Sequence, residues 1–310
     1  MSDILNFYIK SPHVFFNDQS ESFENAEFAI TGVPMDSTSS FRPGSRFAPY
    51  EVRKISNELE SYCIEVGIDF DSLKVCDLGD LIIDFKVTAT LKRLARVVEE
   101  LITENKVFTI IGGEHTITLG EVLAASNLYK DFKVLILDAH MDLRDEYPAE
   151  LKISHATVTR RIGEKIGFKN ILILGVRAVS KEEIDFCKKE NFNRYLTSET
   201  ILTNFGIVKN VLTHFLKPKD NVLLSIDIDV LDPAFAPGVS NPEPMGLTPI
   251  SMMKILRIIT SLPINIVGFD VVEVSPPYDV SGITSLIASR IIKNTICYIA
   301  NKRSKTLKRP

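Results

Sequence analysis

The chain has 310 residues, with 36 lysines and arginines against 40 aspartates and glutamates, so its formal net charge is −4. Apolar residues make up 45% and charged residues 25%, a balance that is typical of a folded globular protein and excludes wholesale disorder. The mild acidity argues against a general nucleic-acid binder, which needs a basic face. No apolar run approaches the ~20 residues of a membrane-spanning helix.

Two further features bear on the setting of the chain. The last ten residues hold five basic side chains and no acid. We expect this basic tail, from about residue 301, to be a solvated, frayed end rather than a contact for a membrane or a nucleic acid. The four cysteines lie far apart and form no CxxC pair, and no secretory apolar region opens the sequence. We therefore expect reduced thiols in a cytoplasmic protein.

Short apolar runs alternate with amphipathic stretches along the chain. The runs predict β-strands near residues 28–33, 73–77, 107–111, 133–137, 170–175, 221–226 and 264–271. The stretches between them predict helices over 87–103, 116–127, 156–167, 199–215 and 249–261, and a long final helix from about 282. This alternation predicts an α/β fold, a single domain over 1–310 with three αβα layers and a mainly parallel central sheet.

Polar groups follow four of the predicted strands, at the edge of a parallel sheet where ligands bind. They are GGEH at 112–115, DAHMD at 138–142, DID at 227–229 and GFDVVE at 268–273. Side chains at alternate positions of an extended segment point to the same side, so DAHMD directs an acid, a histidine and an acid together. Taken alone, each pattern also fits a hydrogen-bonded polar strand end.

If these strands are neighbours, four aspartates and two histidines meet at one end of the sheet. The six residues are His115, Asp138, His140, Asp142, Asp227 and Asp229. Four close carboxylates without a counter-charge are strongly unfavourable, because like charges and burial both raise carboxyl pKa values. Two divalent cations would remove this repulsion, with some carboxylates bridging them. Oxygen-rich ligation with no cysteine nearby favours Mn²⁺ over a thiolate zinc site.

The motifs GGEH, DAHMD, SIDIDVLDPAFAPG and EVSPPYD resemble those of the ureohydrolase family, which includes agmatinases and arginases, and occur in the family's order. The resemblance runs from about Gly32 to the final helix. The stretches TSSFRPGSRFAP, DPAFAPG and SHATVTRRI look most like the agmatinase branch. The resemblance implies an arginase-like fold and a hydrolase that cleaves a guanidino group to urea and an amine, with agmatine as the expected substrate and putrescine, a polyamine precursor, as the amine.

The resemblance also implies two manganese ions. One would be held by His115, Asp138, Asp142 and Asp227. The other would be held by Asp138, His140, Asp227 and Asp229, so that Asp138 and Asp227 bridge. Together the ions would lower the pKa of a shared water, and Asp142 would hold the resulting hydroxide by a hydrogen bond.

Two further residues match catalytic positions of the family. Glu273 matches the glutamate that binds the guanidinium, and a carboxylate can accept two parallel N–H bonds from that planar cation. His155 matches the mobile histidine that protonates the leaving amine, a task suited to a pKa near ~6.5. The alternatives are an ion pair at a strand end for Glu273 and a helix N-terminal residue without a role for His155.

The substrate stays open at this point. Arginine and guanidinobutyrate carry a carboxylate that needs donors, whereas the ammonium of agmatine or aminopropylagmatine needs acceptors. The loop 143–154 contains Arg144 but also three acids. In addition, Ser240, Asn241 and Met245 depart from the residues usual in the family, which leaves the shape of the substrate pocket open.

The sequence can be compared with two rival classes of protein. A single-zinc deacetylase-type hydrolase would need only one Asp–His–Asp set and usually a His-His pair, which the sequence lacks. A non-catalytic family member would be marked by a lost ligand, and all six positions are filled. The resemblance also implies a homo-oligomer, a trimer or hexamer, that acts on a small cationic guanidino substrate.

Overall fold

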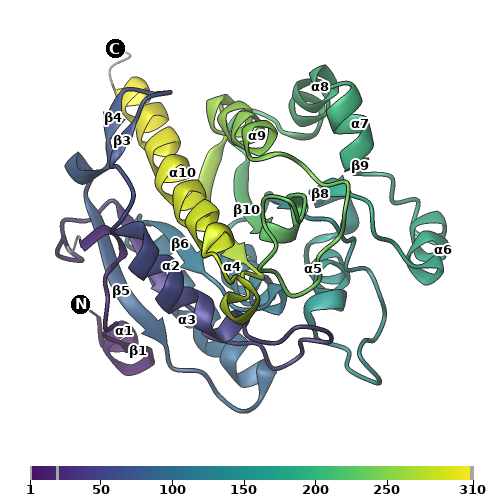
Figure 1. Cartoon of the computed structure of the whole chain (residues 1–310), viewed down its shortest axis with the longest axis horizontal. Helices are drawn as coiled ribbons and strands as arrows, with labels where there is room; N and C mark the ends of the chain where they lie inside the picture. Colours follow the sequence, from purple (N-terminus) through teal and green to yellow (C-terminus); the bar gives the residue numbers. More distant parts are fainter. Residues whose placement is uncertain (1, 19–20, 308–310) are drawn as a thin grey trace.

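The computed structural model describes residues 2–18 and 21–307. Among them, nine strands form one sheet in the order β1-β5-β2-β6-β11-β10-β7-β8-β9 (Figure 1). Every neighbouring pair is parallel except β1 and β5. The bounds are β1 Ile9–Lys10, β2 Phe28–Gly32, β5 Val75–Leu81, β6 Val107–Ile111, β7 Phe132–Leu137, β8 Ile171–Val176, β9 Tyr195–Thr197, β10 Asn221–Asp227 and β11 Asn265–Val272. A separate hairpin pairs β3 (Tyr62–Cys63) with β4 (Ile68–Asp69).

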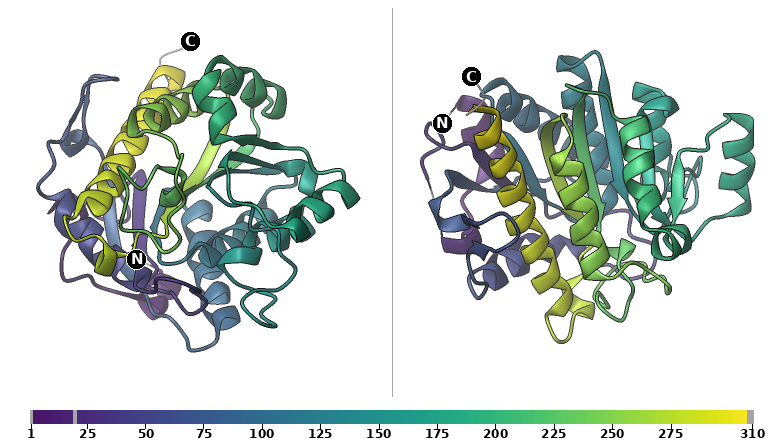
Figure 2. Two further views of the ribbon diagram at one scale, coloured as in Figure 1. Left: turned by 45° about the vertical axis from the view of Figure 1, so that its right-hand side comes forward. Right: turned by 90° about the horizontal axis from the view of Figure 1, so that it is seen from above.

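Helices cover both faces of this sheet. One face packs against α2 Ala48–Ser56, α7 Ser198–Thr203, α8 Gly206–Phe215, α9 Pro249–Ser261 and α10 Ile283–Leu307. The other packs against α1 Asp3–Tyr8, α3 Val87–Thr103, α4 Thr118–Leu128, α5 Val158–Ile166 and α6 Lys181–Lys189. Figure 2 shows α9 and α10 together on one side of the strands. The predicted single domain, with three αβα layers and a mainly parallel sheet, is confirmed.

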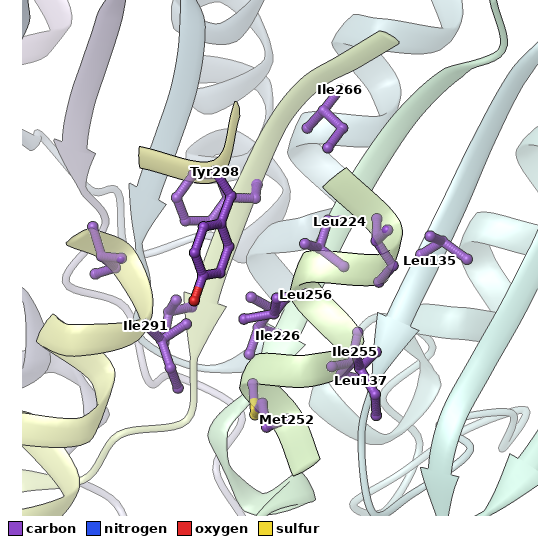
Figure 3. Close-up of a cluster of buried hydrophobic side chains, with 14 of the residues drawn as sticks. Leu135, Leu137, Leu224, Ile226, Met252, Ile255, Leu256, Ile266, Ile291 and Tyr298 are labelled. Carbon is purple, nitrogen blue, oxygen red and sulfur yellow. The ribbon is translucent and has the colours of Figure 1, made fainter. Parts of the chain in front are cut away.

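The side chains of the central strands explain why helices cover both faces of the sheet. In β10, Leu224 and Ile226 belong to the core beneath α9 and α10, whereas Leu223 belongs to the core on the opposite face. Figure 3 shows Leu224 and Ile226 among side chains of α9 and α10, with Leu256 of α9 beside Ile226. Burying each such side chain contributes ~1.5–3 kcal/mol, so a strand that is apolar on both faces requires a helix layer on each.

All seven predicted strands are present, and the differences lie mainly in the helices. The helix expected over 199–215 is two helices, because Asn204, with φ −140° and ψ 73°, interrupts the helical conformation. Helix α6 was not predicted, although Ser180 and Glu183 form a capping box at its start. The short strands β1 and β9 at the sheet edges and the helices α1 and α2 were also missed.

The end of the chain differs from the expectation of a frayed tail. Helix α10 continues to Leu307, so fraying from about residue 301 is wrong for 301–307. One reason is that the ammonium of Lys302 donates a hydrogen bond to the carbonyl of Ile264, which ties the last turns to the start of β11. The rest of the tail, 308–310, lies outside the described residues. Within the described part of the chain, no helix is long and apolar enough to cross a membrane.

Candidate metal centre and active site

The four polar groups predicted from the sequence follow four adjacent strands. The order β6-β11-β10-β7 places the ends of these strands side by side. His115 follows β6, Glu273 follows β11, Asp227 ends β10 and Asp138 follows β7. Because all four strands are parallel, their carboxyl ends lie at one edge of the sheet, and the side chains converge there.

The first cluster is centred on His115. Its Nδ1 lies 3.1 Å from Oδ2 of Asp138, 3.0 Å from Oδ2 of Asp142 and 3.4 Å from Oδ2 of Asp227. All four residues are buried. Nδ1 of His115 and Oδ2 of Asp138 nevertheless make no hydrogen bond within the described structure. Buried lone pairs that face one another without a donor fit a cation between them.

The second cluster shares Asp138 with the first. Nδ1 of His140 lies 3.0 Å from Oδ2 of Asp229 and 3.4 Å from Oδ1 of Asp138. Asp138 therefore presents one oxygen to each histidine, the arrangement expected of a bridging carboxylate. Oδ2 of Asp227 also faces His115, and its Oδ1 accepts a hydrogen bond from the amide of Asp229 at 2.9 Å, as Oδ1 of Asp138 does from the amide of His140 at 2.6 Å. The two clusters, each able to hold a metal ion, contain between them all six predicted ligands.

The charges of this site are unbalanced in the absence of a cation. Burial raises the pKa of Asp142 to about 7, and burial together with the charges of Asp229 and Asp138 raises the pKa of Asp227 well above its usual value. Burial by itself lowers the pKa of His115, but the carboxylates of Asp138 and Asp142 outweigh it and raise that pKa. The cluster thus takes up protons where no metal supplies positive charge.

A buried hydrogen-bond chain orients His115 from the side opposite the carboxylates. Its Nε2 lies 3.1 Å from Oγ of Ser225, and Ser225 donates to Oδ1 of Asp270 at 2.8 Å. Thr118 donates to the other oxygen of Asp270 at 2.8 Å. Since the single hydroxyl proton of Ser225 goes to Asp270, its oxygen accepts the proton of Nε2. Nδ1 of His115 is therefore left unprotonated toward the candidate metal site.

Glu273 lies beside this centre in a strained backbone conformation. Its φ of 66° and that of Asp142, 53°, are in the left-handed region, which non-glycine residues rarely adopt and which clusters at functional sites. Oε1 of Glu273 accepts the amide of His115 at 2.7 Å, while Oε2 is buried and makes no hydrogen bond to described residues. Burial raises the pKa of Glu273 to about 7. The free oxygen suits a cationic donor.

His155 is held between two hydroxyl groups. It is buried at the start of a 3₁₀ helix, His155–Thr157, that leads into α5. Its Nδ1 lies 3.4 Å from Oγ1 of Thr38, and its Nε2 lies 3.1 Å from Oγ of Ser40. Burial lowers the pKa of His155. The sequence alone gives no role to Thr38 or Ser40, because they lie more than 100 positions from His155.

One cavity of about 300 Å³ is lined by His155, Ser40, Glu273 and five of the six predicted ligands, all but Asp138. On its wall, the guanidinium of Arg144 stacks over Tyr147 at 4.8 Å and lies 4.0 Å from a carboxylate oxygen of Glu182. Glu183 also lines the cavity, but both of its oxygens accept backbone amides. Glu243 contributes a partly exposed carboxylate that lies 3.9 Å from Nε2 of His140 and also interacts with the charge of Arg177.

A second arginine fastens the cavity wall to the metal centre. Nη2 of Arg177 donates to the carbonyls of Asp229 at 2.7 Å, Leu231 at 3.2 Å and Glu243 at 2.8 Å. Its Nε donates to the carbonyl of Pro244 at 2.9 Å. One side chain after β8 thus connects the segment that follows β10 with the loop that carries Glu243.

Comparison with known proteins agrees with this geometry. Residues 26–297 match a family model that is described as "Arginase family". The chain is 35% identical to an agmatinase of Bacillus anthracis, over 89% of this chain and 92% of that one. It is 32% identical to a guanidinobutyrase of Pseudomonas aeruginosa, over 94% and 91% of the two chains. The solved agmatine ureohydrolase of Thermoplasma volcanium aligns with a TM-score of 0.84 and 33% identity, covering 92% and 94%.

The chain therefore belongs to the arginase family. Within that family it is an enzyme of the ureohydrolase type, with agmatinases among its similar relatives in both sequence and structure. This confirms the resemblance found in the sequence motifs.

Proposed function

We propose that the protein hydrolyses agmatine to putrescine and urea, with two Mn²⁺ ions as cofactor. The observation that carries the proposal is the pair of His–Asp clusters that share Asp138, in which Nδ1 of His115 and Oδ2 of Asp138 are buried without a hydrogen-bond partner among the described residues. Beside them, Oε2 of Glu273 provides a buried acceptor at the cavity. A guanidinium is the cation whose planar N–H groups match such an acceptor.

The donor set fits two ions. His115, Asp138, Asp142 and Asp227 would hold one, and Asp138, His140, Asp227 and Asp229 the other. Carboxylates with one imidazole at each ion suit Mn²⁺, and the four cysteines lie elsewhere in the core as free thiols. When bound, the ions would supply positive charge and a water of lowered pKa that attacks the guanidinium carbon.

The chain's own residues supply orientation and protons. Glu273, when ionised, would hold the guanidinium so that its carbon faces the attacking water. Asp142 would accept a hydrogen bond from that water, and this bond would keep the lone pair of the water oxygen directed at the guanidinium carbon. His155 would provide the proton for the leaving nitrogen, since its buried position and lowered pKa make its protonated form a ready donor.

The cavity wall favours a substrate that ends in a cation. A substrate carboxylate would need Arg144, but that guanidinium is stacked on Tyr147 and lies near Glu182. An ammonium would need an acceptor, and Glu243 offers a carboxylate at the wall that no lysine or arginine pairs with in the described residues. This supports agmatine over arginine and guanidinobutyrate. Aminopropylagmatine, whose far end is also cationic, is the second candidate.

Urea release from agmatine, arginine, guanidinobutyrate and aminopropylagmatine, measured side by side with Mn²⁺, tests the proposal. We expect the highest kcat/KM with agmatine. A clear preference for arginine or guanidinobutyrate would contradict the substrate but retain the chemistry. No urea from any of the four, with two ions bound per chain, would contradict catalysis and favour a non-catalytic family member. Full activity with Zn²⁺ and none with Mn²⁺ would contradict the choice of metal.

We further propose a homo-oligomer, a trimer or hexamer, that acts in the cytoplasm. The four buried free thiols are compatible with a reducing compartment. Exposed apolar side chains, including Phe41, Phe47 and Val280, provide surface for contact between subunits. Light scattering of the purified protein tests the assembly, and a monomer at micromolar concentration would contradict it.

A further inference from the structure

The hydrogen bonds around His155 have a definite direction, and the buried residue Glu114 sets it. Oε2 of Glu114 accepts the backbone amide of Thr38 at 2.7 Å, and Oε1 accepts the hydroxyl proton of Thr38 at 2.8 Å. Glu114 is fully buried, and its own amide donates to the carbonyl of Met35 at 2.7 Å, which fixes its place. The hydroxyl of Thr38 has one proton, and Glu114 takes it. Toward every other neighbour, Thr38 acts as an acceptor.

That constraint selects the tautomer of His155. The backbone amide of His155 donates to Oγ1 of Thr38 at 3.1 Å, and Nδ1 lies 3.4 Å from the same oxygen. Because Oγ1 can only accept, Nδ1 carries the ring proton when the imidazole is neutral. The lone pair of the ring is then on Nε2, where it accepts the hydroxyl proton of Ser40 at 3.1 Å.

Ser40 also contacts Nε2 of His155 at the wall of the cavity that both residues line. His155 is only 7% exposed, and both of its ring nitrogens face hydroxyl groups of the loop that follows β2. Ser40 is an exposed residue that lines the same cavity as Glu273 and Asp142. A proton on Nε2 of His155 therefore has the oxygen of Ser40 within hydrogen-bond distance, and Ser40 faces the cavity.

We propose that Ser40 relays the proton from His155 to the leaving nitrogen, and that Glu114 and Thr38 position His155 for this transfer. The inference rests on the proposed function. After water has added to the guanidinium carbon, Ser40 gives its hydroxyl proton to the leaving nitrogen and receives the proton of Nε2. The C–N bond breaks with its electron pair on that nitrogen, while the oxygen of the added water forms the C=O bond of urea and its remaining proton passes to solvent. His155 is left neutral with Nδ1 protonated, and solvent reprotonates Nε2.

A kinetic cycle tests the relay. The variants are Ser40→Ala, Ser40→Thr, His155→Asn and the double variant Ser40→Ala/His155→Asn, with Ser37→Ala, an exposed serine of the same loop, as control. We expect Ser40→Ala to lower kcat at least ~10-fold with KM little changed, and Ser40→Thr, which keeps the hydroxyl, to restore most of it. General acid catalysis contributes ~10²–10⁴-fold, so His155→Asn should lose at least as much as Ser40→Ala.

The double variant separates a shared proton path from two independent effects. If Ser40 acts only through His155, removing Ser40 from His155→Asn leaves kcat unchanged. Losses that multiply, or a normal kcat for Ser40→Ala, would overturn the relay. Mn²⁺ content is measured for each variant, and a loss of metal in Ser40→Ala would assign the effect to the metal centre and also overturn it.

A second measurement does not depend on which substrate is cleaved. Nitrogen-15 NMR of the histidine-labelled full chain, loaded with diamagnetic Zn²⁺, reports the tautomer of each imidazole, and His155→Asn identifies the signal. We expect the Nδ1-protonated form of His155 and its loss in Thr38→Val. An Nε2-protonated form in the unaltered protein would overturn the inference. If no substrate releases urea but this tautomer is found, the proposed function fails while the positioning of His155 by Thr38 stands.

Discussion

The hydroxyl oxygen of Ser225 lies 3.1 Å from Nε2 of His115, on the opposite side of the ring from the carboxylate cluster. Since Asp270 accepts the proton of Ser225, this contact fixes which nitrogen of His115 is free for a metal ion. We expect Ser225→Ala to weaken Mn²⁺ binding ~10–100-fold at one of the two sites, as measured by electron paramagnetic resonance of free Mn²⁺ during titration. Ser289→Ala, a buried serine that bonds to the carbonyl of Val52, is the matched control. Unchanged affinity at both sites would contradict the role of Ser225.

Removing one ligand tests the assignment of two ions. Asp229 faces His140 at 3.0 Å and takes no part in the His115 cluster. We expect Asp229→Ala to bind one Mn²⁺ per chain instead of two and to lose urea release, because the second ion lacks its carboxylate. Metal analysis after gel filtration gives the stoichiometry. Asp185→Ala, at an exposed ion pair with Lys181, should behave as the unaltered protein. Near-normal turnover by Asp229→Ala would refute the two-metal assignment.

The stability of the metal-free protein should fall as pH rises. Burial raises the pKa of Asp142 and of Glu273 to about 7, so these groups favour the folded state when protonated. Their stabilising contribution is complete below the ordinary carboxyl pKa of ~4 and is lost as pH rises to about 7. The raised pKa of His115 acts in the same direction above pH ~6.5.

Thermal unfolding in EDTA and in Mn²⁺, at intervals from pH 5 to pH 8, measures this dependence. We expect Tm to decline with pH in EDTA and to recover at the higher pH values in Mn²⁺, because the metal binds the ionised carboxylates. A metal-free Tm that rises between pH 5.5 and 7.5 would show that the cluster is not the dominant titrating group.

The partly exposed carboxylate of Glu243 offers a test of substrate choice. We expect Glu243→Gln to raise KM for agmatine by up to about fivefold, because solvent-exposed charge pairs contribute ~0.2–1 kcal/mol. KM for guanidinobutyrate should stay level or fall, since a like charge has been removed. Glu182→Gln, which alters the neighbour of Arg144, serves as the comparison. Equal changes for both substrates would mean that Glu243 does not distinguish their far ends.

The sequence predicted the strands and which polar residues come together at their ends, for a physical reason. Buried parallel strands are apolar along their whole length, so the polar groups at Asp138 and Asp227 mark their carboxyl ends. That these strands are neighbours became evident only in the sheet order, because pairing depends on contacts between distant segments. Asp270 could also have been predicted to matter, because a charged residue inside an apolar strand needs buried hydrogen-bond partners.

Other parts of the site could not be inferred from local sequence. Thr38 and Ser40 reach His155 from a loop more than 100 positions away, and no spacing rule connects them. The helical end of the chain could not be predicted for a related reason. Its basic composition predicts a solvated, frayed tail, whereas α10 continues to Leu307 and Lys302 donates a hydrogen bond to the carbonyl of Ile264, a residue distant in sequence.

Arg177 holds the loop after β10 through main-chain atoms, so the amino-acid sequence of that loop can vary without loss of these bonds. Its guanidinium binds the loop through the main-chain carbonyls of Glu243 and Pro244, and such bonds persist whatever side chains the loop carries. The same guanidinium donates to the carbonyl of Asp229. Side chains of the loop at the cavity wall can therefore be substituted while the segment that carries Asp229 keeps its position. Ser240 is different, because its amide donates to the carbonyl of Glu273 and its position is therefore tied to the site. A new substrate range can evolve, or be engineered, without rebuilding the centre that breaks the C–N bond.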